Sequence, residues 1–192
     1  MTIDRPKSKQ PLPNHATKVF NGVVFDVYQW EQPQFDGSTK TFEKLSRADS
    51  VEIVAVTAEG KFIVLFEEQP GKEPFQGIPG GQVDVGEQPL EAAQRELREE
   101  TGYESDQWRF WLSYQGLSKI EWCNYIFVAN NCNLNMLAHH DSGEKIQVAE
   151  LDFDQWLEFM LHPECRSDKI KLEILLAERA GKLGQLKHYF LN

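Results

Sequence analysis

The sequence predicts an α/β protein in which a small antiparallel β subdomain precedes a larger domain. Three observations predict this class. Short β-rich runs broken by turn residues fill residues 18–46. Apolar runs of strand length recur at residues 51–67 and 108–129, on either side of one segment with helical spacing. Two more helical segments follow near the C-terminus, so the order of elements is the mixed one of an α/β domain.

Length and composition limit the classes of protein that this chain can be. A chain of 192 residues can bury one sizeable core but is short for several domains. Its net charge of −10 disfavours nucleic acid as a partner, because an acidic field repels phosphate backbones. The sequence has neither an apolar run of about 18 residues nor the apolar core of a signal peptide. We therefore expect a cytoplasmic protein without a membrane partner.

The N-terminal third divides into two parts. Residues 1–16 are rich in Pro, Lys and Asn without periodicity, which predicts a flexible arm. Residues 17–48 are expected to form the β subdomain, since turn residues such as Asn21-Gly22 interrupt the β-rich runs. Residues 49–192 are then expected to form the larger domain.

Within the larger domain, apolar runs predict strands and amphipathic spacing predicts helices. The expected strands are residues 51–56, 61–67, 108–114, 122–129 and 146–148, with a polar loop at residues 130–145. The expected C-terminal helices are residues 152–162 and 167–181, the second capped by Ser167 and closed by Gly181.

The helix in the middle of the chain has the clearest limits. It begins near Gln88 or Pro89, since proline suits a first helical turn, and Gly102 suits its C-terminal cap. At about 100° per residue, an apolar arc and an acidic arc lie side by side. Leu90, Ala93 and Leu97 form the first arc, and Glu96, Glu99 and Glu100 form the second.

The acidic arc needs a cation. Like charges four residues apart, such as Glu96 and Glu100, destabilise a helix by roughly 0.2–0.5 kcal/mol, and partial burial raises that cost. Arg95 can pair with Glu99, but one guanidinium does not neutralise three carboxylates. Carboxylates without His or Cys beside them are hard oxygen ligands, which favour Mg²⁺ or Mn²⁺ over zinc. Magnesium often shares its ligand sites with phosphates, so the helix indicates phosphate chemistry.

A solvated acidic helix surface is the simpler reading, but two neighbouring features argue against it. The Pro-Gly-Gly run at residues 79–81 allows a tight turn and a close approach of bare backbone to a ligand. Gly86-Glu87 brings a further carboxylate to the start of the helix. Two segments therefore converge on the same place.

Together these residues resemble a family motif. Gly81, five residues, Glu87, seven residues and then RELREETGY at residues 95–103 match the Nudix box, G-x5-E-x7-R-E-U-x-E-E-x-G-U, with U bulky and apolar. Every fixed letter is present, and Tyr103 departs mildly as an aromatic where an aliphatic residue is usual. The resemblance implies an α/β/α sandwich around a mixed sheet, and hydrolysis of a pyrophosphate linked to another group, X.

Carried onto this sequence, the resemblance implies roles for the residues of the motif. Arg95 orients the glutamates, and Glu87 and Gly81 support the cluster. The divalent cations, Mg²⁺ or Mn²⁺, are held by three glutamates and the backbone carbonyl of Gly80: Glu96, Glu99 and Glu100. The expected catalytic residues of the helix are Arg95, Glu96 and Glu99.

The flanking segments resemble the branch of ADP-ribose pyrophosphatases and nucleoside-diphosphate-sugar hydrolases. The resemblance rests on the β-rich run at residues 18–46, on RADSVEIVAV from Arg47 and on GEKIQV from Gly143. In that branch the N-terminal strands are exchanged across a homodimer. The resemblance further implies substrate contact by Arg47. It also implies a general base or a further metal ligand at Glu144 or, less well aligned, at Asp141, and a solvated loop is the equally weighted alternative for these two residues.

Two departures leave the substrate open. Gly77 stands where that branch often has a glutamate, and no proline occurs between Glu104 and His162. Glu121 either restores the missing carboxylate in a substrate-binding role or is an exposed loop acid.

The sequence thus predicts a metal-dependent hydrolase that converts ADP-ribose or a related nucleotide sugar into a nucleoside monophosphate and a sugar phosphate. A nucleoside triphosphate pyrophosphatase and a nucleotide-sensing domain without turnover are the alternatives. The expected partners are a small nucleotide and a second copy of the chain.

Overall fold

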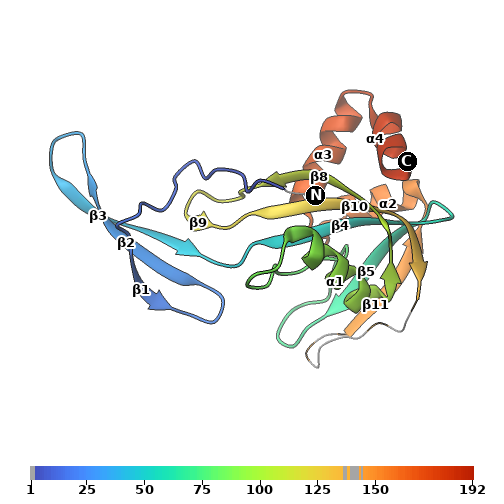
Figure 1. Cartoon of the computed structure of the whole chain (residues 1–192). Coiled ribbons are helices and arrows are strands. Elements are labelled where there is room, and N and C mark those ends of the chain that lie inside the picture. The colour runs from blue at the N-terminus through green and yellow to red at the C-terminus, as the bar shows by residue number, and fades with distance from the viewer. Residues whose placement is uncertain (1–2, 136–137, 139–142, 144) are drawn as a thin grey trace.

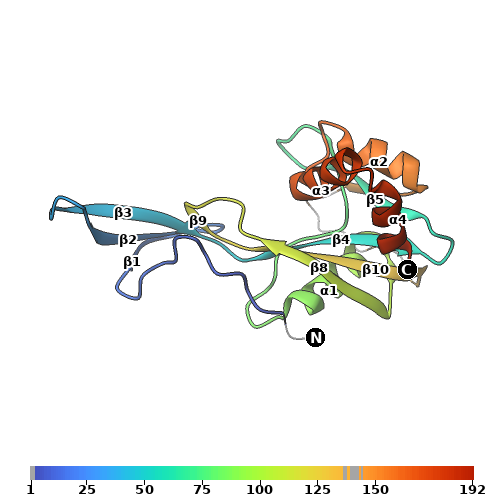
Figure 2. The ribbon, with the colours of Figure 1, turned by 90° about the horizontal axis from the view of Figure 1, so that it is seen from above.

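The computed structural model describes residues 3–135, 138, 143 and 145–192. Two sheets and four helices make up this part of the chain, and one sheet projects away from the other (Figures 1 and 2). In the part of the chain that is described, no helix is long and apolar enough to cross a membrane.

The projecting sheet is N-terminal and has the order β1-β2-β3-β9. Its first three strands are antiparallel: β1 (Thr17–Asn21), β2 (Asp26–Pro33) and β3 (Thr39–Ser46). The fourth, β9 (Ile120–Glu121), lies parallel to β3 and comes from the larger domain. The antiparallel β subdomain expected from the turn residues is therefore confirmed.

The main sheet has the order β11-β5-β4-β10-β7, with β6 also paired to β5 and β8 to β10. Its strands are β4 (Ser50–Thr57), β5 (Phe62–Glu68), β6 (Phe75–Gly77), β7 (Tyr103–Glu104), β8 (Gln107–Tyr114), β10 (Asn124–Leu134) and β11 (Lys145–Leu151). β4 and β10 run parallel, whereas the other pairs are antiparallel. The sheet is mixed, as predicted.

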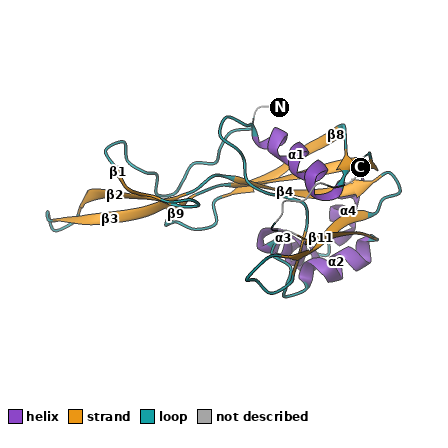
Figure 3. Cartoon of the chain, turned by 90° about the horizontal axis from the view of Figure 1, so that it is seen from below, coloured by secondary structure: helices purple, strands orange, loops and turns teal. Residues whose placement is uncertain are grey.

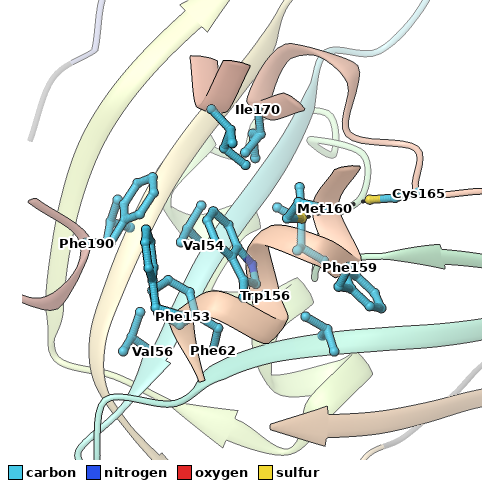
Figure 4. Close-up of a cluster of buried hydrophobic side chains, with 14 of the residues drawn as sticks. Val54, Val56, Phe62, Phe153, Trp156, Phe159, Met160, Cys165, Ile170 and Phe190 are labelled. Carbon is cyan, nitrogen blue, oxygen red and sulfur yellow. Dashed lines mark hydrogen bonds between the residues drawn. The ribbon is translucent and has the colours of Figure 1, made fainter. Parts of the chain in front are cut away.

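Helices cover both faces of this sheet (Figures 1 and 3). Helix α1 (Pro89–Thr101) packs on one face, against the odd-numbered residues of β4. Helices α2 (Phe153–Leu161), α3 (Asp168–Arg179) and α4 (Leu183–Leu191) cover the other face. On that face Trp156 is fully buried and stacks on Phe62, with ring centroids 4.7 Å apart (Figure 4). The three layers confirm the α/β/α sandwich.

Three departures from the expected elements have physical reasons. β10 continues to Leu134, five residues beyond its expected end, because Asn133 and Leu134 pair with β7. The strand contains a bulge after Ala129, where Asn131 adopts a positive φ of 55°. The expectation of a loop at those residues was wrong. Helix α4 was not expected at all. The short strands β6, β7 and β9 form only through pairing with distant strands, so no local signal marks them.

Candidate active site

Helix α1 places the acidic residues of the motif. Pro89 begins it, and the Glu91 side chain accepts a hydrogen bond of 2.9 Å from the Gln88 backbone N–H, which satisfies a free donor of the first turn. Gly102 ends it in the left-handed conformation, at φ 76°, with its N–H bonded to the Arg98 carbonyl. The buried side chains that dock the helix on the sheet are Ala92, Ala93 and Leu97. The limits expected for this helix are confirmed.

The loop before α1 runs along the first half of β4. Its Pro79 and Gly81 carbonyls accept hydrogen bonds from the N–H groups of Ile53 and Val51, at 2.8 and 2.9 Å. Between them, the Gly80 N–H faces the other way and donates to Glu100 Oε2 at 2.8 Å. Alternation along such an extended segment turns the Gly80 carbonyl away from β4 as well. The loop is thus fixed to the sheet on one side and to the acidic helix on the other.

Gly80 and Gly81 are required for different reasons. A Cβ at Gly80 would lie 2.3 Å from the backbone oxygen of Val51, so a side chain would push the loop off β4. A Cβ at Gly81 would lie 2.2 Å from Glu96 Oε1. The space that a side chain of residue 81 would fill therefore contains the Glu96 carboxylate.

Arg95 is the central cation of the acidic cluster. Its guanidinium donates to both carboxylate oxygens of Glu87, at 3.0 Å each, to Glu96 Oε1 at 2.8 Å and to Glu99 Oε2 at 3.2 Å. It also donates to the Gln82 carbonyl at 2.9 Å. The motif arginine thereby links the loop, the start of the helix and the acidic face, a geometry that a planar five-donor group can satisfy.

The charges of the cluster are not balanced. Hydrogen bonds from Arg95 lower the pKa of Glu87 below its usual value. Burial raises the pKa of Glu96, and the hydrogen bond and positive charge of Arg95 only partly oppose this. Because one guanidinium is shared by three carboxylates, the cluster keeps an excess of negative charge, which a further cation would relieve.

The oxygen ligands of the cluster fit a divalent cation, but in this structure the carboxylates are bonded to protein groups instead. Carboxylates beside backbone carbonyls are the ligands of Mg²⁺ and Mn²⁺. Within the residues that the structure describes, however, no three His, Cys, Asp or Glu side chains converge as a metal site. Glu96 and Glu99 bind Arg95, and Glu100 binds the Gly80 N–H. The Glu99 side chain is 45% exposed, compared with 14% for that of Glu96.

The residues predicted outside the motif have separate surroundings. Glu144 and Asp141 lie outside the described residues. Arg47 follows β3, and its Cζ lies 5.8 Å from the Phe25 ring and 5.6 Å from the Trp122 ring. Its buried Nε has no hydrogen-bond partner among the described residues. The substrate role of Arg47 stays a prediction.

Glu121 lies in β9 and is held by ion pairs. Its carboxylate accepts hydrogen bonds from Lys44 Nζ at 2.6 Å and from Arg5 Nη1 at 2.7 Å. The Lys44 side chain is only 1% exposed. These contacts join the segment before β1 to the sheet, so Glu121 stabilises the fold. Its predicted role in substrate binding stays a prediction.

Two carboxylates near the loop were missed by the sequence reasoning. Glu52 in β4 is partly buried, accepts a hydrogen bond from Asn124 Nδ2, and has a pKa raised by burial. Glu67 Oε1 lies 3.1 Å from the position that a Cβ of Gly77 would take, so β5 brings a carboxylate to the place where a glutamate was expected. The signal for Glu52 was available, since it is the one charged residue in the apolar run of β4. Glu67 could be placed only through strand pairing.

Comparison with known proteins agrees with this geometry. The NUDIX domain family matches residues 46–172, which is more than half of the chain. An ADP-ribose pyrophosphatase of Bacillus subtilis (strain 168) is 30% identical over 148 residues, covering 74% of this chain and 73% of that protein. A methanol dehydrogenase activator of Bacillus methanolicus is 27% identical over 146 residues, covering 74% of this chain and 79% of that protein.

A solved structure described as an ADP compounds hydrolase has the same fold. It superposes with a TM-score of 0.70 at 20% identity and covers 94% of this chain and 98% of that chain. The family match, the complete motif and the three-layer fold agree with one another. The chain therefore belongs to the Nudix family of pyrophosphohydrolases, as the resemblance to the ADP-ribose pyrophosphatase branch implied.

Proposed function

We propose that this protein hydrolyses the pyrophosphate bond of ADP-ribose or a related nucleotide sugar, with Mg²⁺ or Mn²⁺, giving a nucleoside monophosphate and a sugar phosphate. The observation that carries the proposal is the complete acidic cluster around Arg95, seated against the Gly80-Gly81 backbone. The names of a relative and of the solved structure, an ADP-ribose pyrophosphatase and an ADP compounds hydrolase, support the choice of substrate class.

The residues of the cluster are proposed to have different roles according to their positions. Glu96, Glu99 and Glu100 would hold the ion together with the Gly80 carbonyl. When bound there, the ion supplies positive charge to the pyrophosphate and favours deprotonation of the attacking water. Arg95 keeps Glu87, Glu96 and Glu99 close together before the substrate arrives, which reduces the reorganisation that the reaction requires.

The proposal includes a homodimer formed through the projecting sheet. β1 is an edge strand whose five residues are all exposed. The exposed fractions of the nearby apolar side chains Val19, Phe20, Val23 and Val24 range from 49% to 105%. An isolated sheet with an apolar, unpaired edge is stabilised when another chain covers it.

The first test is turnover by the purified protein with Mg²⁺, with products separated by chromatography. The substrates are ADP-ribose, other nucleotide sugars and nucleoside triphosphates. We expect AMP and ribose 5-phosphate from ADP-ribose, loss of activity on chelation with EDTA, and recovery when Mg²⁺ is returned. Preferred release of inorganic pyrophosphate from triphosphates would contradict the proposed substrate class.

A further inference from the structure

A cavity of about 240 Å³ opens at the end of the main sheet where β5 lies between β6 and β11. Strand pairing places Gln76 of β6, Phe66 of β5 and Gln147 of β11 in one row across it. Successive residues of a strand point to opposite faces, so this row lies on one face of the sheet. It is the face of α2, because the Phe66 ring packs edge-on against Phe159 at 5.5 Å.

Phe66 is an unusual residue for this position. Although its ring packs on α2, the side chain is 39% exposed, and it stands between two amide side chains. The charged residues that line the cavity are Glu67, Glu68, Glu164 and Lys145. The lining thus combines one apolar ring face with groups that accept and donate hydrogen bonds on several sides.

The cavity lies on the face of the sheet opposite α1, and a short stretch of chain connects it to the proposed site of cleavage. β6 continues from Gln76 through Gly77 to Gly80, whose N–H is bound by Glu100 of α1. Four residues of extended chain span at most about 13 Å, which a diphosphate with an attached sugar can bridge.

We propose that this cavity receives group X of the substrate and that X is a neutral sugar. A sugar carries hydroxyl groups around its whole rim, each able to donate to a carboxylate and to accept from an amide or ammonium group. A nucleobase offers only a few edge groups and would leave several of the polar side chains unpaired. A phosphate is disfavoured because three of the four charged residues that line the cavity are glutamates. The assignment rests on the proposed function and specifies one half of its substrate.

The test compares two substrates that share the nucleoside and the pyrophosphate. ADP-ribose carries the sugar, whereas the methyl ester of ADP carries a methyl group in its place. We expect kcat/KM of the wild-type protein to be at least tenfold higher for ADP-ribose, because a site built for hydroxyl groups penalises their absence. Gln76→Leu and Gln147→Leu are each expected to lower kcat/KM for ADP-ribose about tenfold and to leave that for methyl ADP unchanged.

The control variants are chosen away from the cavity. Gln185→Leu in α4 makes the same replacement at an exposed position, and we expect no change with either substrate. IDP-ribose differs from ADP-ribose only in its base, so it tests whether the cavity binds the nucleobase and not the sugar. Its kcat/KM should fall in the cavity variants by the same factor as that of ADP-ribose.

Each other result overturns the assignment in a recognisable way. Equal losses on ADP-ribose and methyl ADP would show a general effect on folding or catalysis. Unchanged kinetics on both, or no wild-type preference for ADP-ribose, would show that the cavity does not bind X. A change in base preference would assign the cavity to the nucleoside. If the wild-type protein cleaves no nucleotide diphosphate, the proposed function itself fails, and this inference fails with it.

Discussion

The glutamates of the acidic helix together carry more negative charge than the Arg95 side chain can neutralise. Its guanidinium is shared among Glu87, Glu96 and Glu99, and Glu100 is left to bind the Gly80 N–H. An ion that enters must therefore replace some of these internal bonds. Arg95 and the Gly80 N–H hold these carboxylates in place through internal bonds.

Glu100→Gln tests the charge without removing the contact. The amide oxygen of glutamine still accepts from the Gly80 N–H, but the negative charge for the ion is lost. We expect turnover to fall at least about 100-fold, with the free energy of unfolding within about 1 kcal/mol of the wild type. Steady-state kinetics and urea denaturation measure the two quantities. Glu91→Gln, which keeps the N-terminal contact of the same helix, is the control, and unchanged turnover in Glu100→Gln would remove the proposed mechanism.

Replacement of the two loop glycines by alanine is expected to have different effects. In Gly80→Ala the new Cβ meets the Val51 backbone, which cannot move without disturbing β4, so we expect a loss of about 1–3 kcal/mol in unfolding free energy. In Gly81→Ala the Cβ meets only the end of the Glu96 side chain. That carboxylate can turn aside, so we expect near-normal stability but at least tenfold lower turnover. Equal stability losses in both variants would contradict this reading of the loop.

At the scale of elements, ion pairs fasten the projecting sheet to the main one. The buried Lys44 of β3 binds Glu121 of β9 and the Gln10 carbonyl, and Arg5 binds Glu121 together with Asp49. The segment before β1 was expected to be a flexible arm, but these contacts tie its residues 5–10 to the junction of the sheets. Removing one partner of such a network leaves a buried charge uncompensated.

Glu121→Gln should destabilise the protein in a pH-dependent way. Burial raises the pKa of Glu121, but the hydrogen bonds from Lys44 and Arg5 outweigh it, so the pKa lies below its usual value. A lowered folded-state pKa means that the stabilisation is complete above the usual glutamate pKa and is lost as the pH falls through the folded-state value. We expect a loss of about 3 kcal/mol at pH 7 that shrinks toward pH 3.

Urea denaturation of the wild type and Glu121→Gln at the two pH values measures this difference. Glu43→Gln on the exposed side of β3 is the control, and its effect should stay within about 0.5 kcal/mol at both. A loss in Glu121→Gln that does not change with pH would show that the charge of Glu121 is not its cause.

Helix α4 closes the core on the face opposite α1. Phe190 is fully buried against Phe62, Trp111 and Trp156, and Asn130 Nδ2 donates to its carbonyl at 2.6 Å. We expect Phe190→Ala to lower the free energy of unfolding by about 3–5 kcal/mol, since it leaves a cavity among rigid rings. Leu191→Ala, at a partly exposed neighbour, should lower it by much less. Similar losses in both would mean that α4 is not anchored through Phe190.

At the scale of the whole molecule, the projecting sheet leaves apolar surface that one chain does not cover. Val23 and Phe20 are exposed beside the unpaired edge of β1. We expect a dimer by sedimentation equilibrium, and a monomer in the double variant Phe20→Lys, Val23→Lys, because charge on that edge opposes strand pairing. Leu172→Lys on the exposed face of α3 is the control and should remain dimeric. A monomeric wild-type protein would contradict the proposed assembly.

The sequence by itself determined the acidic helix, its caps and most of the strands. These features depend on residues close together in the chain: Pro89 and Gly102 limit α1, and spacings of three and four residues place Glu96, Glu99 and Glu100 on one face. The Nudix box is such a local pattern, which is why family and fold class could be read from it. The roles of these glutamates in holding an ion stay predictions.

Only the tertiary structure decided which residues meet across the strands. Strand pairing placed Gln76, Phe66 and Gln147 in one row, put the Glu67 carboxylate beside Gly77 and gave Glu121 its partners Lys44 and Arg5. It also extended β10 through polar residues and held α4 on the core. The physical reason is that neighbours across a sheet come from distant parts of the chain, and the register that joins them is a property of the folded molecule.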